Sequence, residues 1–222
     1  MLKNKIIKKE VFLKSVMKSD LIWIGEIHGI KENYAIYKKI IPDLAKNGFK
    51  NFLWEMESDF SETSIDSEDG RINRFSINFL KWVNKQIKNG RLEKLTFFGN
   101  VGNDGNGSYD EKMAAQFIDR FENKKSIVIS GNFHMGGPIN DREGIQPCLT
   151  FVKNKTGLKI LKIGVKYAGG NLYNYGIKKM SKTFYFGDEN NLKFGTITKN
   201  INDETFFVHA GKAHAVFKKP SH

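Results

Sequence analysis

The chain has only one cysteine, Cys148, among its 222 residues. A single thiol excludes an internal disulfide framework and any zinc site built on cysteines. Long apolar runs are also absent, since none approaches the roughly 20 residues that a membrane-spanning helix needs. The basic stretch at residues 1–20 interrupts its apolar residues with lysines, so it lacks the apolar core of a signal peptide. We therefore expect a cytoplasmic protein without a membrane span.

Blocks of like charge are missing too, although 36 Lys and Arg against 24 Asp and Glu give a formal net charge of +12. A strongly basic chain can bind nucleic acid or an acidic surface. Here the lysines are spread along the chain in ones and twos, as on an ordinary solvated surface. Nucleic acid is therefore not the expected partner. The hydrophobic fraction of 40% and the 18 Phe indicate a folded globule, which we expect to be one domain over residues 1–222.

What the chain does contain is an alternation of short apolar stretches and amphipathic ones. Residues 21–24 are apolar on both faces and too few for a helix, which is typical of a buried parallel strand. Further strands are expected at residues 49–56, 95–98, 126–130, 158–165, 183–187 and 205–209. Helices are expected at residues 1–18, 32–46, 71–88 and 110–121. This pattern predicts an α/β fold with a central, largely parallel β-sheet flanked by helices, and some antiparallel edge strands toward the C-terminus.

Two polar stretches without periodicity are predicted to be loops. Residues 58–70 are acidic and follow a strand directly, so this loop could lie over a site. Residues 99–108 contain four glycines with Gly-x-x-Gly spacing. They lack the Gly-Lys-Ser/Thr ending of a phosphate-binding loop and the dinucleotide fingerprint, so we expect a flexible loop there.

Ionisable side chains follow three of the expected strands at their carboxyl ends. The first strand runs into Glu26 and His28, and the second ends in Glu55. The strand at residues 126–130 is followed by His134. Ligands of open α/β sheets bind at this edge, and Glu32, four residues after His28, could share a helix face with it. The recurrence predicts a catalytic site formed by Glu26, His28, Glu32, Glu55 and His134.

These residue types support two kinds of chemistry. A histidine with a pKa near ~6.5 exchanges protons at neutral pH, and carboxylates can orient it, which would activate water by acid–base catalysis. Alternatively, His28, Glu55 and His134 could bind a divalent metal through nitrogen and oxygen. Spacing alone does not choose between the two. Each residue could also be a hydrogen-bonded rim residue, and Glu26 could cap the next helix; recurrence at three strand ends favours a site. We expect Cys148, His209 and His214 to be structural.

The order of these residues resembles the erythromycin esterase/ChaN-like superfamily, which also includes the Tiki-type metalloproteases and the haem-binding ChaN lipoproteins. The matching motifs are Gly25-Glu26-Ile27-His28-Gly29-x-x-Glu32, then Glu55, then Asp110-Glu111-x-Met113-Ala114, then Gly131-Asn132-x-His134. The resemblance spans residues 22–134 and implies an α/β domain with its site at the carboxyl edge of a largely parallel sheet.

The resemblance also implies roles for individual residues. Glu26 and His28 match the first catalytic motif, and Glu32 matches the acidic residue of the esterases' His-Gly-x-x-Glu. Glu55 matches the second-strand carboxylate and His134 the late histidine. In the esterases such residues activate water against a lactone without metal, whereas their equivalents in the Tiki type bind metal for peptide hydrolysis.

The chain departs from the superfamily pattern in three places. Glu26 and His28 are one residue closer together than the corresponding pair in the esterases, and Tyr109 stands where the esterases have an arginine. The chain also lacks the lipobox and the second histidine of the ChaN type.

We therefore expect a hydrolase that activates water with a His/Glu cluster and cleaves an ester or amide bond in a small molecule or peptide. A divalent ion (manganese, iron, cobalt or zinc) could assist it. The alternative is a haem- or metal-binding protein of the ChaN-like type without turnover.

Overall fold

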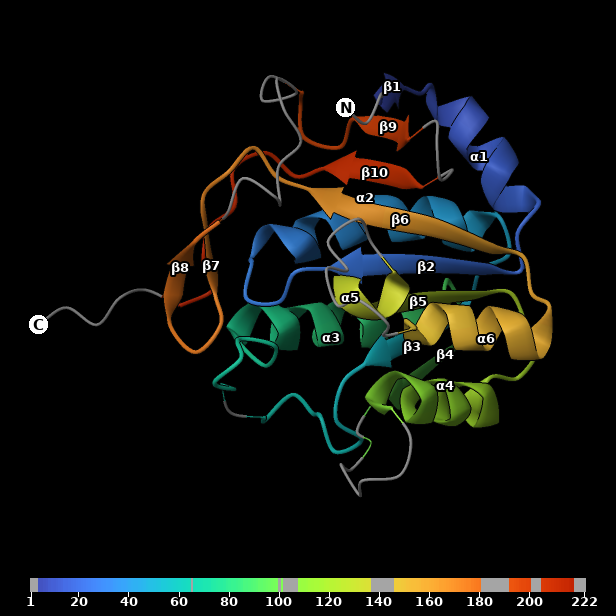
Figure 1. Ribbon diagram of the computed structural model, residues 1–222, viewed down its shortest axis with the longest axis horizontal. Helices are drawn as coiled ribbons and strands as arrows, with labels where there is room; N and C mark the ends of the chain where they lie inside the picture. Colours follow the sequence, from blue (N-terminus) through green and yellow to red (C-terminus); the bar gives the residue numbers. More distant parts are fainter. Residues whose placement is uncertain are drawn as a thin grey trace, which may run out of the picture.

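A computed structural model describes residues 4–64, 66–99, 101, 108–136, 146–180, 192–200 and 205–217. It is an α/β structure in which one eight-stranded mixed sheet lies between two layers of helices (Figure 1). A separate two-stranded antiparallel sheet lies near the C-terminus. The predicted fold class is confirmed. Within the described ranges, no helix combines the length and the apolar composition that crossing a bilayer requires.

The sheet is parallel over most of its width, with the strand order β1-β9-β10-β6-β2-β5-β3-β4. Its strands are β1 (Asn4–Ile6), β2 (Leu21–Glu26), β3 (Asn51–Glu55), β4 (Lys94–Phe98), β5 (Ser126–Gly131), β6 (Ile160–Lys166), β9 (Ile197–Asn200) and β10 (Phe206–His209). The small sheet pairs β7 (Asn171–Tyr173) with β8 (Ile177–Lys179). Among the strands that the structure describes in the large sheet, only the pairs β1–β9 and β9–β10 are antiparallel, which confirms the antiparallel edge expected toward the C-terminus.

The helices cover both faces of the sheet. They are α1 (Lys9–Met17), α2 (Glu32–Lys46), α3 (Arg74–Lys88), α4 (Tyr109–Arg120), α5 (Asn132–Met135) and α6 (Cys148–Thr156). One apolar core joins α1, α2 and α3 to the sheet, and a second joins α4, α5 and α6 to the other face (Figure 1). Alternate residues of β2 divide between them, since Ile22 and Ile24 lie in the first core and Leu21 and Trp23 in the second. Burial on both faces explains why this strand reads as a continuous apolar run.

The observed elements differ from the predicted ones in several places. The helix expected at residues 1–18 is instead strand β1 followed by α1. The helix expected from Arg71 begins at Arg74, because Asn73 caps it by accepting the N–H groups of Phe75 and Ser76. Helices α5 and α6 and strands β1, β7, β8 and β9 were not predicted. The strand expected at residues 183–187 and most of the loop at 99–108 lie outside the described residues.

The described part of the predicted loop, residues 58–64 and 66–70, is irregular, and the side chain of Phe60 packs into the protein. Phe60 is 5% exposed, and its ring lies 5.5 Å from that of Trp54 and 5.7 Å from that of Phe97. At the end of the loop, the N–H of Tyr175 donates to the carbonyl of Glu68. These contacts hold the loop along the carboxyl edge of the sheet.

Gly29, directly after His28, joins this edge to the small sheet. It has a φ of +75°, and a Cβ at this position would lie 1.8 Å from the carbonyl oxygen of Tyr173. The Gly29 carbonyl accepts the N–H groups of Tyr173 and Val216. Glycine is therefore required here for its backbone conformation and for the close approach of two chain segments.

Replacing Gly29 by Ala should destabilise the protein more than the same change at Gly90. Gly90 has a similar φ of +68° but nothing within 4 Å of an added Cβ. We expect Gly90→Ala to cost about 1 kcal/mol for its left-handed backbone. The backbone clash at Gly29 should add about 1–3 kcal/mol. Chemical denaturation of both variants measures this difference, and equal losses would contradict the account.

Candidate functional site

The predicted site residues come together because β2, β5 and β3 are neighbours in the sheet. Strand β5 is parallel to both β2 and β3, with Glu26 opposite Gly131 in the register. A Cβ placed on Gly131 would lie 3.0 Å from His28 Nε2, 3.3 Å from His134 Cδ2 and 3.6 Å from Glu55 Oε2. The three side chains therefore meet over one glycine at the end of β5, which lies between β2 and β3.

His28 is paired with Glu26 at the end of β2. The distance from His28 Nδ1 to Glu26 Oε1 is 2.9 Å, and the Glu26 side chain is 2% exposed. The second oxygen of Glu26 accepts the hydroxyl of Tyr37 from α2. Burial and the charge of Glu26 raise the pKa of Tyr37 well above its usual value, so the phenol keeps the proton that it donates. When Nδ1 of His28 donates to the carboxylate, Nε2 is the nitrogen that is free to accept a proton.

His134 is paired with a second carboxylate, Asp110, on α4. The distance from His134 Nδ1 to Asp110 Oδ1 is 2.8 Å, and this oxygen also accepts the backbone N–H of Cys148 at 2.8 Å. Burial alone would lower the pKa of His134, but the hydrogen bond to Asp110 and the charges of Glu55 and Asp110 outweigh it and raise the pKa. The charged form of His134 is therefore favoured.

Glu55 lies between the two histidine pairs and is fully buried. Its Oε2 accepts the N–H of Gly131 at 2.6 Å, while Oε1 lies 3.2 Å from Arg71 Nη1 and 3.5 Å from His134 Nε2. Neither contact of Oε1 has hydrogen-bond geometry, so within the described residues this buried oxygen accepts no hydrogen bond. Burial alone would raise the pKa of Glu55, but Arg71, the two histidines and the Gly131 N–H lower it. Glu55 is therefore an anion with one oxygen available to a donor.

Arg71 is a member of the cluster that the sequence did not indicate, because it reads as the first residue of a helix. The Asn73 cap leaves it in the preceding turn, where its backbone N–H donates to Asp69 Oδ1 at 2.9 Å and its Nε lies 3.4 Å from Asp69 Oδ2. Burial opposes its charge, but Glu55 and Asp69 raise the pKa of Arg71 further. A guanidinium thus reaches the site from the turn that precedes α3.

Asp110 is a second residue missing from the predicted site, although it stands in the Asp110-Glu111-x-Met113-Ala114 motif. Its role shows only once α4, α5 and α6 are packed, because it links His134 on α5 to the first residue of α6. The thiol of Cys148 itself is buried, which raises its pKa and leaves it protonated. A reactive thiol is therefore not part of this cluster.

Glu32 is a predicted site residue that is not bonded to the cluster. Its Oε1 lies 2.8 Å from His214 Nδ1, and its Oε2 accepts the His214 N–H at 2.8 Å. This pair ties the start of α2 to the chain near the C-terminus. His209 is buried in β10, with its Nε2 3.1 Å from the hydroxyl of Thr198.

The predicted metal ligands His28, Glu55 and His134 converge, but their surroundings do not suit a metal ion. Across the described ranges, no group of three or more His, Cys, Asp and Glu side chains is arranged to hold one. The guanidinium of Arg71 already lies 3.2 Å from Glu55 Oε1, the oxygen through which Glu55 would bind a metal ion beside His134.

Comparisons of the chain with protein-family models, with curated proteins and with solved structures find no match.

The raised pKa of His134 predicts a pH dependence of stability. A histidine whose pKa is raised on folding stabilises the protein fully below its unfolded pKa of ~6.5, and this contribution is lost as the pH rises through the folded pKa. Relative to His134→Gln, the wild type should therefore lose unfolding free energy as the pH increases above ~6.5.

NMR titration measures the pKa itself, with the His134 signal assigned from its absence in His134→Gln. Asp110→Asn removes the charge that faces Nδ1 and should move the pKa of His134 downward. A His134 pKa that does not change in Asp110→Asn would contradict the geometry described here.

Proposed function

We propose that this protein is a metal-independent hydrolase that directs an activated water molecule at an ester or amide carbonyl. The observation that carries the proposal is that Glu55 Oε1, buried next to two carboxylate–histidine pairs, accepts no hydrogen bond from the residues that the structure describes. A buried anion with a free acceptor oxygen is a suitable place to hold a water molecule, because an unpaired buried acceptor is costly.

The two histidines would have opposite roles. His28, held by Glu26 through Nδ1, takes the proton of the water molecule on Nε2 as the general base. His134, whose raised pKa favours the charged form, gives a proton from Nε2 to the leaving oxygen or nitrogen as the general acid. The water oxygen bonds to the carbonyl carbon, the bond to the leaving group breaks, and solvent restores both protonation states.

Glu55 and Arg71 would position and stabilise rather than transfer protons. The lowered pKa of Glu55 makes it a poor base, so its Oε1 orients the water molecule by accepting one of its hydrogens. The guanidinium of Arg71 keeps Glu55 ionised and supplies positive charge near the negative charge that develops on the carbonyl oxygen. The resemblance to the erythromycin esterases supports a mechanism in which Arg71 rather than a metal ion supplies the positive charge, since that group acts without metal.

Substitution of either cluster histidine should abolish most hydrolysis. Loss of a general acid or base typically costs about 10²–10⁴-fold in rate. We expect kcat for activated esters and lactones to fall by this order in His28→Gln and in His134→Gln, measured under conditions where circular dichroism shows that both variants are folded.

His214→Gln is the matched control, since His214 also pairs with a glutamate but lies 52% exposed and bonded to Glu32. It should keep wild-type activity. Full activity in both cluster variants, or an equal loss in His214→Gln, would refute the assignment.

Chelation should leave the activity unchanged. Protein purified without chelator is assayed before and after dialysis against EDTA, and then again with added manganese or zinc. Equal rates are expected because Arg71 rather than a metal ion neutralises Glu55. Activity that disappears with EDTA and returns with a metal would show a metal-assisted mechanism instead.

A further inference from the structure

The charge around the site is opposite in sign to that of the rest of the protein. From residue 55 to residue 70, the chain carries seven acidic residues and no Lys or Arg, in a protein with a net charge of +12. We call residues 55–70 the acidic segment. Its acidic residues are Glu55, Glu57, Asp59, Glu62, Asp66, Glu68 and Asp69.

The acidic segment begins and ends at the site. It leaves the sheet at Glu55 and leads directly into Arg71, whose Nη1 lies 3.2 Å from Glu55 Oε1. Its middle is held by the burial of Phe60, and its end lies beside the residue that follows His28, since a Cβ on Gly70 would be 3.0 Å from Gly29 Cα. The exposed carboxylates are therefore attached to the rim of the site.

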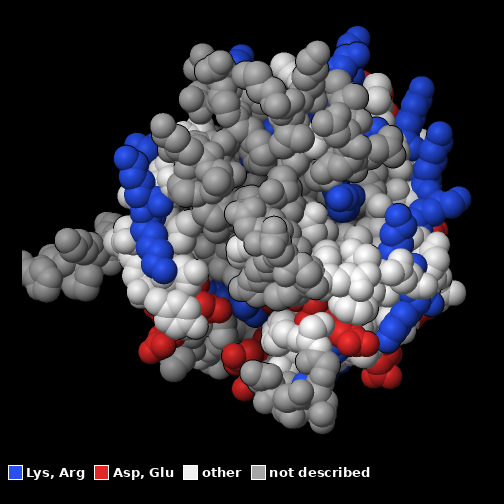
Figure 2. Space-filling view, viewed as in Figure 1, with Lys and Arg blue, Asp and Glu red and all other residues white. Residues whose placement is uncertain are grey.

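Most of these carboxylates are not neutralised. Five of them, at positions 57, 59, 62, 66 and 68, are exposed, and within the described ranges none lies within 4 Å of a basic nitrogen, the criterion for an ion pair. Figure 2 shows carboxylates gathered in a band across the lower part of the visible face, with most Lys and Arg to the left, top and right of it. A local field of this kind concentrates cations at the site and repels anions.

The interior of the site adds two further carboxylates, Glu26 and Asp110, to Glu55 and Asp69 of the acidic segment. The four carboxylates face one arginine and the two histidines. These carboxylates outnumber the permanent cation, and Glu55 keeps a buried oxygen that accepts no hydrogen bond in the described chain.

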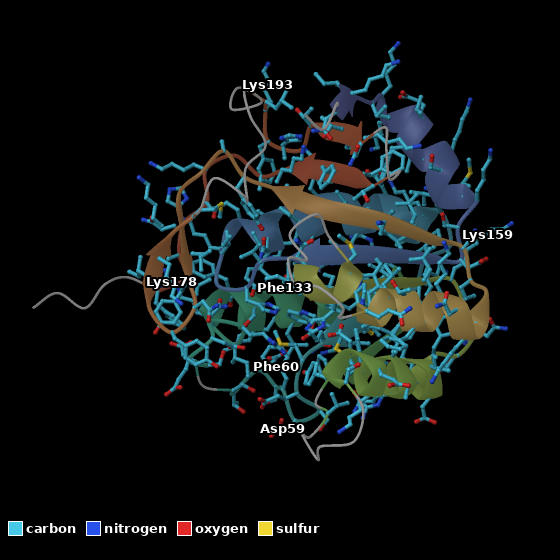
Figure 3. All side chains as sticks on the ribbon, viewed as in Figure 1. Asp59, Phe60, Phe133, Lys159, Lys178 and Lys193 are labelled. Carbon is cyan, nitrogen blue, oxygen red and sulfur yellow. The ribbon has the colours of Figure 1, made fainter. Side chains whose placement is uncertain are left out.

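Two exposed aromatic residues are neighbours of His134, Tyr109 in space and Phe133 in sequence. Tyr109 is 42% exposed with its ring 5.6 Å from that of His134, and Phe133, next to His134 in the sequence, is 43% exposed. Figure 3 shows Phe133 near the middle of the view, with Phe60 and Asp59 of the acidic segment below it. Aromatic faces attract ammonium groups, so these rings favour the same sign of ligand charge.

We propose that the substrate of this site carries a positive charge, as an ester or amide with an ammonium group near the scissile bond. This inference rests on the proposed hydrolase function and names its substrate class. The acidic segment draws the cation to the rim, the rings of Tyr109 and Phe133 contact it, and the carbonyl reaches the cluster over Gly131.

Three nitrophenyl esters of matched size test the proposal. In the first ester the acyl group is trimethylammoniobutyrate, which is cationic. In the second, a tert-butyl group replaces the trimethylammonium group, so that the ester is neutral. In the third, the acyl group is glutarate, whose free carboxylate gives the ester one negative charge. We expect kcat/KM to be at least about tenfold higher for the cationic than for the neutral ester at low salt, and lowest for the anionic one. The ratio should decrease as salt is added, because the rim charges are exposed. Equal values for the cationic and neutral esters would overturn the proposal.

Variants that remove charge show which carboxylates cause the preference for the cationic ester. Glu57→Gln, Asp59→Asn and Glu68→Gln, combined in one protein, should lower the preference for the cationic ester while the rate for the neutral ester stays unchanged. The matched control combines Glu10→Gln, Asp43→Asn and Glu93→Gln, which removes the same number of carboxylates away from the acidic segment and should keep the preference. A preference that persists in the first protein, or is lost equally in both, would contradict the assignment to the acidic segment.

Binding of compounds that cannot be hydrolysed separates an incorrect hydrolase proposal from an incorrect charge preference. The ketone isosteres of the cationic and neutral esters cannot be hydrolysed, and calorimetry measures their binding directly. If no ester is cleaved but the cationic ketone binds more tightly than the neutral one, the charge preference stands and the hydrolase proposal fails. If the two ketones bind equally, the charge preference is wrong whether or not esters are cleaved.

Discussion

The buried charge of Glu55 is the constraint on which the rest of the site depends. A carboxylate without exposure to water is expensive unless it is paired, and removing one partner of such a pair typically costs about 3–5 kcal/mol. Here Arg71, the Gly131 N–H and His134 share that task. They still leave one oxygen of Glu55 without a hydrogen bond, which suits binding of a polar ligand better than maximal stability.

The two histidine pairs around Glu55 are supported from opposite faces of the sheet. On one face, Tyr37 of α2 holds Glu26, which in turn orients His28. On the other, the first N–H of α6 holds Asp110 of α4, which orients His134 on α5. Each imidazole therefore presents its Nε2 from a ring that the packed layers keep in place. Helix α5 has four residues and is too short to be stable alone. The packing around it explains how it nevertheless holds His134 in a fixed position.

Much of the fold and part of the site could be predicted from the sequence because both follow local patterns. The apolar runs of β2, β3 and β5 are buried on two faces, and parallel order brings Glu26, Glu55 and His134 to one edge. Arg71 could not be predicted as a site residue, since its position depends on the turn that ends at Asn73, the cap of α3. Helical spacing places Glu32 near His28 and therefore predicts it as a site residue. Spacing cannot show that His214, far along the chain, binds both oxygens of Glu32. The short strands β1 and β9 also depend on partners that are distant in sequence.

In the proposed mechanism, Glu55 Oε1 holds a water molecule within reach of the two histidines. A crystal structure of the wild-type protein, at a resolution that shows ordered water, would reveal it. We expect a well-ordered water molecule hydrogen-bonded to Glu55 Oε1 and to Nε2 of His28 or His134. A metal ion bound by His28, Glu55 and His134, or a side chain that closes the space beside Oε1, would contradict it.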